Sequence, residues 1–342
     1  MKTLVLPCGA ENIETAAGLI RRGELVAFPT ETVYGLGANG LDGAAVTRIF
    51  EAKGRPADNP LILHIADMAQ LAPLIGGPPP ETAKALAQAF WPGPMTMVMK
   101  KSAAVPDEVT AELDTVAVRM PSHPDALRLL TAAGVPVAAP SANRSGRPSP
   151  TTAAHVLEDM NGRIPLILDG GPCAVGLEST VVDVTGGVPR VLRPGGVTPE
   201  MIRRTLGAVQ VDESALRPLH EGETARSPGM KYRHYAPKGR LTIVRGEDAK
   251  VAAAIAAAYD AATAAGEKCA ILAPSGAPYG GRAVRPLGDT PREIAANLFA
   301  ALREMDEMGV TRMFAEAVDT GGLGLAVMNR LGRAAAFDIL EV

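Results

Sequence analysis

The chain has 342 residues, of which 47% are hydrophobic and 21% charged, a composition typical of a soluble globular protein long enough for two domains. Lys and Arg total 34 against 37 Asp and Glu, and this near balance excludes a general electrostatic attraction to nucleic acid or an anionic membrane. The first residues form neither a signal peptide nor a spanning helix, because Pro7 breaks a short apolar run and Glu11 follows it, so we expect a cytoplasmic protein.

Strand and helix patterns alternate along the first half of the chain. A helix is predicted over Ile13–Arg22, before Gly23, and another over residues 43–53, with Asp42 as N-cap and Gly54 as stop. Strands are predicted at Leu4–Leu6, Leu25–Phe28, Leu61–Ile65, Met95–Met99, Thr115–Met120, Val135–Pro140, Pro165–Asp169 and Ser179–Val184. This order favours a mixed α/β (α+β) domain.

The stretch Gly35–Gly40, with the sequence GLGANG, has the spacing of a dinucleotide-binding glycine motif. Such a motif needs its first glycine directly after a strand and its last in the first turn of a helix. Here Thr30–Tyr34 separate the strand from the glycines, and the next helix begins only after Asp42. The order argues against NAD binding and predicts a glycine-rich loop. Three hydroxyl side chains at spacing two would share one face of an extended segment before that loop: Thr30, Thr32 and Tyr34.

After Gly207 the pattern changes. The stretch from Gln210 to Arg240 shows no sustained period and is rich in proline and glycine, which predicts a linker or a long functional loop. From Leu241 strands and helices alternate again, ending in a helix that begins near Gly324. Cysteines at three distant positions show no metal-ligand spacing, and we expect buried thiols: Cys8, Cys173 and Cys269.

Polar and charged side chains are concentrated in a few loops. Lys53 and Arg55 stand two residues apart at a helix end, a place that the helix dipole also favours for cations, and Asn59 follows. The loop APSANRSGRPSP (139–150) follows a buried-looking strand and holds hydroxyl, amide and guanidinium groups. Such loops commonly bind anions, although each is also typical of an ordinary polar turn.

Seven ordered motifs in the first two hundred residues together resemble one family, the threonylcarbamoyl-AMP synthases with their YrdC-like domain. They are PTETVYGLG, KGRPADNPL, WPGPMTMV, VAVRMPSHP, APSANRSGRPSPT, GLESTVVDV and VLRPG. Two later stretches, SPGMKYRHYAP and GLGLAVMNRLGRAA, resemble the long form of the family. The resemblance implies a YrdC-like catalytic domain at 1–208, a linker or lid at 209–239 and a smaller Rossmann-like α/β domain at 240–342. It also implies a twisted mixed sheet with helices and a concave open face in the first domain.

The resemblance implies that L-threonine, bicarbonate or CO2, and ATP give threonylcarbamoyl-AMP and pyrophosphate. The product would pass to a tRNA threonylcarbamoyl-transfer complex. Attack of a carbamate oxygen on the α-phosphorus of ATP needs charge neutralisation and alignment more than a protein nucleophile. Mg2+ is expected to enter with ATP, held mainly by phosphate oxygens and water and not by protein ligands.

Site roles follow from matching each position to the motifs of the family. Lys53 and Arg55 are expected to act in catalysis by neutralising the ATP phosphates. Further ATP contacts are implied for Asn59, Thr115, Ser141, Asn143, Ser149, Arg193 and Tyr235. Arg119 would bind the carboxylate of threonine through its planar guanidinium. The rest of the amino-acid site would comprise Thr32, His64, Ala139 and Ser179.

The stretch SPGMKYRHYAP carries aromatic and cationic side chains that a passive spacer does not need. We interpret it as a lid over the N-terminal cleft, with Tyr235 approaching the nucleotide. Two alternatives remain open. One is a module that binds double-stranded RNA without turnover, or a weak RNA affinity beside the activity. The other is a hydrogenase-maturation carbamoyltransferase, whose acylphosphatase-like and zinc-finger segments have no counterpart here.

Overall fold

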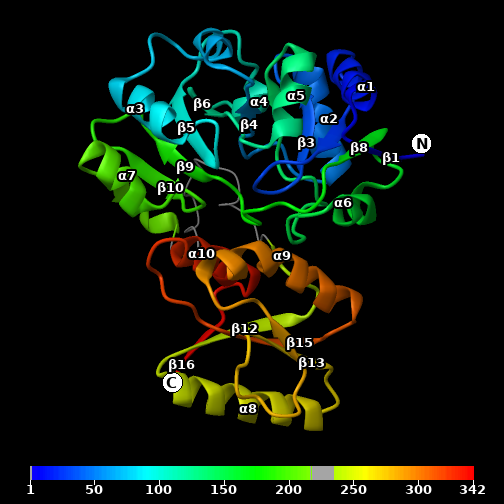
Figure 1. Ribbon diagram of the computed structural model, residues 1–342, viewed down its shortest axis with the longest axis vertical. Helices are drawn as coiled ribbons and strands as arrows, with labels where there is room; N and C mark the ends of the chain where they lie inside the picture. Colours follow the sequence, from blue (N-terminus) through cyan, green and yellow to red (C-terminus); the bar gives the residue numbers. More distant parts are fainter. Residues whose placement is uncertain (1, 216, 218–234) are drawn as a thin grey trace. The chain divides into compact units, whose positions relative to one another are not determined.

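The computed structural model describes residues 2–215, 217 and 235–342 and divides into two compact units, each with its own sheet (Figure 1). The first unit comprises the described residues up to Ser145 and resumes at Ser149. The second comprises Gly146–Pro148 together with the residues from Tyr235 to the end of the chain. Both units mix helices and strands, which confirms the predicted α/β class.

The elements of the first unit alternate much as the sequence predicts. Its strands are β1 (Leu4–Pro7), β2 (Val26–Phe28), β3 (Gly35–Asn39), β4 (Ile62–His64), β5 (Met95–Lys100), β6 (Thr115–Arg119), β7 (Val137–Ala138), β8 (Leu166–Asp169), β9 (Thr180–Asp183), β10 (Arg190–Arg193) and β11 (Gln210–Val211). Its α-helices are α1 (Ala10–Arg21), α2 (Gly43–Lys53), α3 (Glu81–Phe90), α4 (Asp107–Thr110), α5 (Pro124–Ala133), α6 (Ala153–Met160) and α7 (Pro199–Leu206). Short 3-10 helices are η1 (Met68–Gln70), η2 (Ala72–Leu74) and η3 (Glu213–Ala215).

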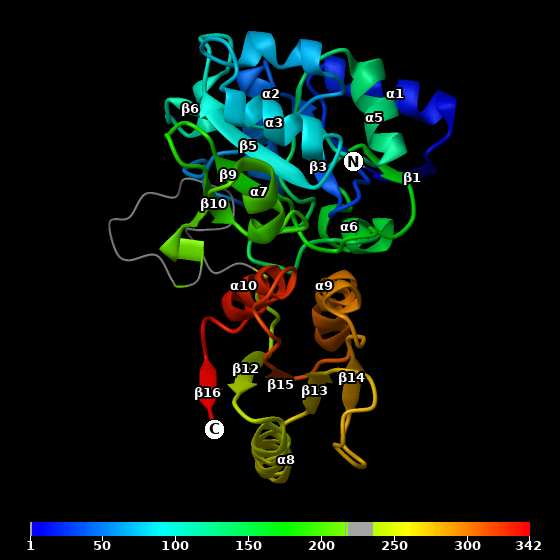
Figure 2. The same cartoon turned by 60° about the vertical axis from the view of Figure 1, so that its left-hand side comes forward.

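These strands form one mixed sheet in the order β1-β8-β2-β3-β7-β4-β6-β5-β9-β10-β11. Figure 2 shows β5, β9 and β10 side by side in this sheet, where β5 pairs parallel to β9 and β9 pairs antiparallel to β10. Strands distant in sequence are therefore neighbours in space. The last residues of β4 and β6, His64 and Arg119, and Ser179 just before β9 therefore lie at the same edge of the sheet.

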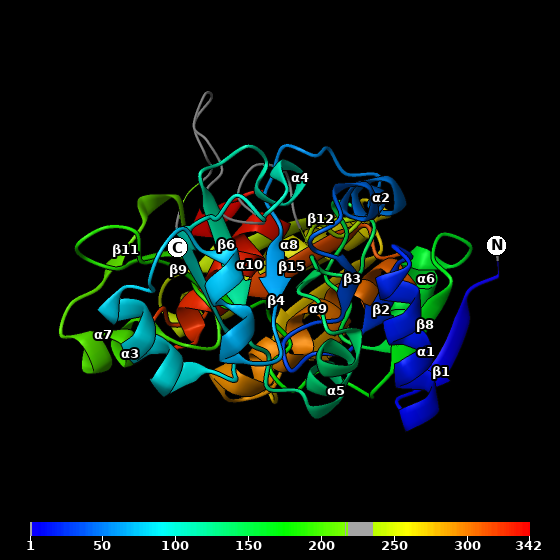
Figure 3. The same ribbon diagram turned by 90° about the horizontal axis from the view of Figure 1, so that it is seen from above.

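The two faces of this sheet bury different cores. On β2, Val26 and Phe28 join a core with α1 and α5, whereas Ala27 joins the larger core on the other face. Helix α1 packs on α5 and on β2, β3 and β8 (Figure 3). The strands from β4 to β10 carry a small apolar cluster of their own: Ile62, Val98, Ala117, Val181 and Leu192. The face that carries Val26 and Phe28 therefore has two parts. Helices α1 and α5 cover one part, and the small apolar cluster, here called the minor core, lies on the other.

The glycine-rich stretch at Gly35–Asn39 is strand β3, paired antiparallel with β2, so the prediction of a loop there was wrong. A Cβ atom on Gly37 would lie 2.9 Å from the Phe28 ring and 2.9 Å from Val137. One on Gly35 would lie 3.2 Å from the same ring. The glycines therefore allow close packing across the strands.

Helix α2 begins and ends at the residues that the sequence predicted, Asp42 and Gly54. The Asp42 carboxylate accepts hydrogen bonds from the backbone N–H groups of Ala44 and Ala45, and Gly54 ends the helix in the left-handed conformation. Its buried face comprises Ala45, Val46, Ile49, Phe50, Ala52 and Lys53. Lys53, in the last turn of the helix, therefore lies in the protein interior.

The second unit has a parallel sheet between two helical layers, α8 on one side and α9 with α10 on the other (Figures 1 and 2). Its strands are β12 (Arg240–Arg245), β13 (Cys269–Ala273), β14 (Val284–Pro286), β15 (Arg312–Glu316) and β16 (Ile339–Glu341). Its helices are α8 (Asp248–Ala264), α9 (Pro291–Glu307) and α10 (Gly324–Ala334). The strand order is β14-β13-β15-β12-β16, so β15 is inserted between β12 and β13 and the order departs from that of the dinucleotide-binding Rossmann sheet.

The prediction of buried thiols is confirmed for Cys173 and Cys269 but was wrong for Cys8. All three thiols are free, and Cys173 and Cys269 are buried while Cys8 is partly exposed. Burial raises the pKa of Cys173 to about 12, so this thiol stays protonated at neutral pH. In the part of the chain that the structure describes, no helix combines the length and apolarity needed to cross a bilayer.

Candidate active site

A row of polar side chains crosses β4, β6 and β5 on the face with the minor core. The register pairs His64 with Arg119 and Arg119 with Thr96. Directly paired residues project from the same face of a sheet, so the three side chains form a line across three strands. All three are at most 4% exposed. Their neighbours Leu63, Met97 and Val118 alternate to the opposite face and its large core.

The guanidinium of Arg119 is fixed by three neighbours. Its Nε donates to the carbonyl of Gly93 at 3.3 Å, and its NH1 donates to Oγ1 of Thr32 at 2.9 Å. Its NH2 lies 2.7 Å from Oε1 of Glu31. The structure therefore brings Thr32 and Arg119, both predicted for the amino-acid site, into direct contact.

His64 is fully buried beside this arginine and packs its ring edge-on against Phe28, with ring centroids 6.2 Å apart. Its Nδ1 lies 3.2 Å from the carbonyl of Ile62. Burial, together with the charge of Arg119, lowers the pKa of His64 to about 3, although Glu31 opposes the shift. The imidazole is therefore neutral at physiological pH.

Because His64 is buried in its neutral form, we expect the protein to be less stable to unfolding at acidic pH. We expect the free energy of unfolding to fall by about 2 kcal/mol between pH 8 and pH 5 through His64. The unfolded residue binds a proton below its ordinary pKa of 6.5, whereas the folded residue stays neutral to about 3. The unfolded state therefore binds more protons as the pH falls. Urea unfolding of the wild type and of His64→Gln at both pH values tests this, and equal losses in the two proteins would contradict it.

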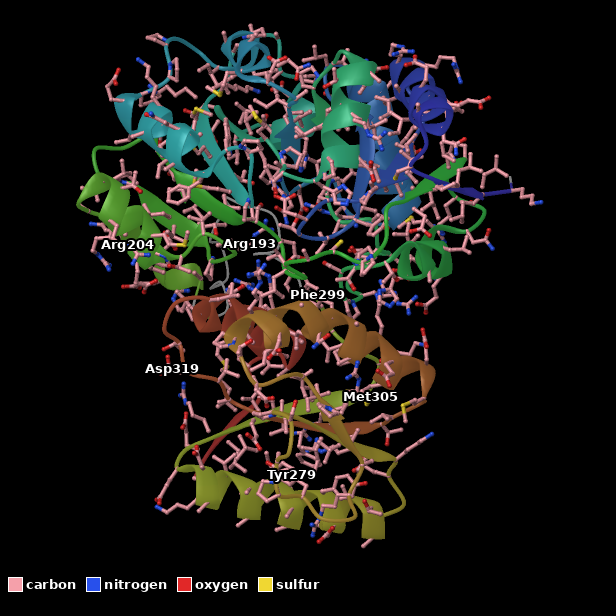
Figure 4. All side chains as sticks on the ribbon, viewed as in Figure 1. Arg193, Arg204, Tyr279, Phe299, Met305 and Asp319 are labelled. Atoms are coloured by element: carbon pink, nitrogen blue, oxygen red, sulfur yellow. The ribbon has the colours of Figure 1, made fainter. Side chains whose placement is uncertain are left out.

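A second polar group lies where β9 and β10 meet and includes Arg193, which is labelled in Figure 4. The Oγ of Ser179 is 2.8 Å from Oγ1 of Thr96. Arg193 donates from Nε to the Ser179 carbonyl at 3.1 Å and from NH2 to its Oγ at 3.3 Å. Thr96 thus connects Ser179 and Arg193 to the row that holds Arg119.

Lys53 holds the loop at residues 141–145. Its Nζ donates to the carbonyls of Ser141 and Asn143 at 2.5 and 2.6 Å and lies 3.4 Å from Oδ1 of Asn143. Ser141 Oγ donates to the same Oδ1 at 2.6 Å, and the Ser145 N–H donates to the Lys53 carbonyl at 2.9 Å. Lys53, Ser141 and Asn143, which the motifs placed at the nucleotide, form one network around a buried ammonium.

Arg55 and Asn59 form a neighbouring pair. NH2 of Arg55 donates to the Asn59 carbonyl at 2.8 Å, and its guanidinium lies over the Phe50 ring at 5.6 Å. Asn59 is fully buried, and within the described residues neither atom of its side-chain amide has a hydrogen-bond partner. A buried amide with unused donors and an unused acceptor is costly unless a ligand satisfies it.

The remaining predicted residues lie in several places. Ser149 is fully buried and donates to the Glu178 carboxylate. Thr115 begins β6 and alternates to the same face as Arg119. Ala139 is buried in the core under α1 and α5. Tyr235 belongs to the second unit, where its ring packs on Phe299 with centroids 5.1 Å apart (Phe299 is labelled in Figure 4). Of the predicted lid SPGMKYRHYAP (227–237), residues 227–234 lie outside the described residues.

Three buried residues near the site were absent from the sequence prediction: Glu31, Thr96 and Glu178. Thr96 could have been found, because it is a polar residue in the apolar strand MTMVM. Glu31 was missed because an extended segment would point it away from Thr30 and Thr32, but this segment bends. The expected shared face holds for those two threonines, whose Oγ1 atoms are 2.8 Å apart, and was wrong for Tyr34. The Tyr34 hydroxyl donates to the Gly171 carbonyl at 2.7 Å.

Comparison with known proteins covers nearly the whole chain. A family model described as telomere recombination matches residues 18–195, and one described as the C-terminal domain of threonylcarbamoyl-AMP synthase matches residues 197–336. Threonylcarbamoyl-AMP synthase of Pyrococcus abyssi is 52% identical over 330 residues, which are 96% of each chain. The chain belongs to the threonylcarbamoyl-AMP synthase family.

Other members of the threonylcarbamoyl-AMP synthase family agree with this assignment. The Bacillus subtilis enzyme of that name is 47% identical over 337 residues, 96% of this chain and 94% of its own. The crystal structure of P. abyssi Sua5 complexed with L-threonine matches with a TM-score of 0.95 and 50% identity, covering 99% of this chain and 100% of that one. As a threonylcarbamoyl-AMP synthase, the chain is an enzyme of the nucleotidyltransferase type, and the alternative of an RNA-binding module is not favoured.

Proposed function

We propose that this enzyme joins L-threonine, bicarbonate or CO2, and ATP to give threonylcarbamoyl-AMP and pyrophosphate, in the cytoplasm. Family membership supports the reaction, and the solved relative complexed with L-threonine supports the amino-acid substrate. The observation that carries the proposal is the buried Arg119 in line with His64 and Thr96 on one sheet face. The product would be consumed by a tRNA threonylcarbamoyl-transfer complex, and a weak affinity for RNA would assist that transfer.

The amino-acid end of the site is built around Arg119. Its guanidinium would bind the carboxylate of threonine, because a planar fork of N–H groups matches a carboxylate in two parallel hydrogen bonds. The hydroxyls of Thr32 and Ser179 and the neutral His64 supply groups for the threonine hydroxyl and amine. Ala139 would line the same site.

The nucleotide end is built from cations and amides. Lys53, Arg55 and Arg193 are at most 8% exposed, and positive charges in such surroundings stabilise phosphate oxygens more strongly than they would in water. The unused amide of Asn59 adds donors and an acceptor. Further nucleotide contacts are proposed for Thr115, Ser141, Asn143, Ser149 and Tyr235.

The proposed reaction does not require a covalent intermediate on the protein. The neutral amine of threonine forms a carbamate anion with CO2 and releases one proton to water, and a carbamate oxygen then attacks the α-phosphorus of ATP as the bond to pyrophosphate breaks. Arg119 would hold the amino acid still for this attack, while Lys53 and Arg55 would stabilise the negative charge that grows on the phosphates and on the leaving pyrophosphate.

We propose that Mg2+ accompanies ATP. The charged side chains described above near the nucleotide end are mainly cations, which bind phosphate and not metal. Within the described residues, no three His, Cys, Asp or Glu side chains are grouped so that they could hold a metal ion. This arrangement fits an ion held by phosphate oxygens and water, where it would withdraw charge from the triphosphate.

The proposed reaction is tested by incubating the protein with ATP, labelled L-threonine and bicarbonate. Threonylcarbamoyl-AMP and pyrophosphate should form in equal amounts, and omission of any one substrate should abolish both. Absence of both products from the complete mixture, with a folded protein, would overturn the proposal. RNA binding without pyrophosphate release would instead support the binding module.

Substrate selectivity gives a further prediction. Threonine should exceed serine in kcat/KM by roughly 10 to 200-fold, because serine lacks one methyl group, and should exceed valine by far more. Valine lacks the hydroxyl and cannot make the hydrogen bonds proposed between the threonine hydroxyl and side chains such as Thr32 and Ser179. The measurement is pyrophosphate release with each amino acid. Equal kcat/KM for threonine and valine would show that the hydroxyl is not recognised.

A further inference from the structure

Glu31 is a buried carboxylate that the proposed reaction leaves unused. Its side chain is 10% exposed and its Oε1 lies 2.7 Å from NH2 of Arg119, whose own side chain is 4% exposed. Burial alone would raise the pKa of Glu31, but the charge of Arg119 and hydrogen-bond donors near the carboxylate together outweigh burial, so the pKa lies below its ordinary range. Glu31 is therefore ionised at neutral pH.

The backbone around Glu31 is fixed on both sides. Oγ1 of Thr30 accepts hydrogen bonds from the N–H groups of Thr32 and Val33 at 3.1 and 3.2 Å and donates to the Val33 carbonyl at 2.6 Å. The Glu31 carbonyl accepts from the Val175 N–H at 2.8 Å. These bonds hold the bend that turns the Glu31 side chain toward Arg119.

Two neighbours on this bend contact the two terminal nitrogens of the same guanidinium. Thr32 accepts from NH1 of Arg119, whereas Glu31 lies next to NH2. Gly93 accepts from Nε. The Glu31 contact is an ion pair without hydrogen-bond geometry, and among the described residues NH2 donates to no acceptor. Since a guanidinium has five N–H groups, donors remain on both terminal nitrogens for a planar carboxylate.

We propose that Glu31 is a positioning residue, which holds NH2 of Arg119 so that the remaining N–H groups face the carboxylate of the amino-acid substrate. The inference rests on the proposed binding of L-threonine through Arg119. Without Glu31, a buried guanidinium would turn toward other acceptors and lose its alignment. A displacement of about 1 Å at such a contact can change a rate by as much as ~10²-fold.

The test compares Glu31→Ala and Glu31→Gln with the wild type in pyrophosphate release. Glu31→Ala is expected to raise the KM for L-threonine at least ~10-fold and to leave the KM for ATP unchanged. Glu31→Gln keeps the length and an acceptor oxygen, so it should recover most of the affinity for threonine. A residue needed only for folding would alter both KM values or neither.

A competitor without a carboxylate separates positioning from direct contact with the substrate amine. L-threoninol keeps the amine and the side-chain hydroxyl of threonine and has a CH2OH group in place of the carboxylate. If Glu31 acts through Arg119, the inhibition constant of L-threoninol should be equal in wild type and Glu31→Ala. If Glu31 binds the amine directly, the variant should weaken L-threoninol as much as threonine, and this result would overturn the proposal.

The control is Glu14→Ala, which removes an exposed carboxylate 2.6 Å from Arg21 and should leave every constant unchanged. If Glu31→Ala does not fold, Glu31→Asp replaces it, because the shorter carboxylate keeps the charge and should still raise the KM for threonine. An unchanged or lowered KM for threonine in a folded variant would overturn the inference alone. Failure of the wild type to use threonine would instead overturn the proposed function.

Discussion

Replacing Arg119 by lysine is expected to raise the KM for L-threonine at least ~30-fold while the protein stays folded. Lysine keeps the positive charge beside Glu31 but loses the planar fork that contacts Gly93, Thr32 and Glu31 at once. Removing one partner of a buried, hydrogen-bonded charge pair costs about 2–5 kcal/mol, so losing the fork while keeping the charge is expected to cost about 2 kcal/mol, which is ~30-fold at 1.4 kcal/mol per tenfold change in affinity. The measurement is pyrophosphate release against threonine concentration at saturating ATP.

Lysine is preferred to alanine here because Arg119→Ala would leave the Glu31 charge buried without its partner. Such a loss destabilises proteins by roughly 3–5 kcal/mol and would confuse binding with folding. Arg128→Lys is a matched control, since Arg128 is half-exposed and paired with Asp125 on α5. If Arg119→Lys binds threonine as tightly as the wild type, the carboxylate is held elsewhere and the proposed amino-acid site is wrong.

Replacing Lys53 by methionine is expected to reduce the rate of pyrophosphate formation by ~10²-fold or more. The Lys53 stem is buried, so methionine keeps the packing and removes only the ammonium. That ammonium donates to the carbonyls of Ser141 and Asn143, so its loss also loosens the loop proposed to hold the nucleotide. Both effects lower kcat, and the second also raises the KM for ATP. Arg55→Ala should act in the same direction.

The thermal unfolding of Lys53→Met should be measured beside these assays. The carbonyls of Ser141 and Asn143 lose a donor in this variant, which is expected to lower the free energy of unfolding by about 1–3 kcal/mol. Lys84→Met is the matched control: Lys84 is half-exposed on α3 and pairs with Glu81 at 2.6 Å. Its rate should equal that of the wild type. Turnover close to wild type in folded Lys53→Met would remove Lys53 from the catalytic residues.

Elements with local signals could be predicted from the sequence. Helix α2 begins and ends where Asp42 and Gly54 indicate, because capping is decided within one turn of the chain. The strands β4, β5, β6 and β9 fall where short apolar runs predict them. The ordered motifs also sufficed to place the chain in its family, because each motif is a short run of residues read without reference to the fold.

Other features depend on partners distant in sequence. Residues 35–39 were predicted as a loop because the glycines lie between a predicted strand and the next helix, but close packing against Phe28 and Val137 makes glycine the residue that fits in β3. In the second unit, β15 lies between β12 and β13, an order that no local pattern indicates. In both cases the structure is decided by contacts that form only in the folded chain.

The sequence by itself determined the family, the types of residue at the site and most of the elements that carry them. Only the tertiary structure decided which of these residues meet. The register of β4, β6 and β5 sets His64, Arg119 and Thr96 in one row, and a one-residue slip would have placed a side chain on the opposite face. The bend at Thr30 turns Glu31 onto Arg119, 88 positions further along the chain. Register and long-range ion pairs are set by packing over the whole sheet, and for that reason no short stretch of sequence contains them.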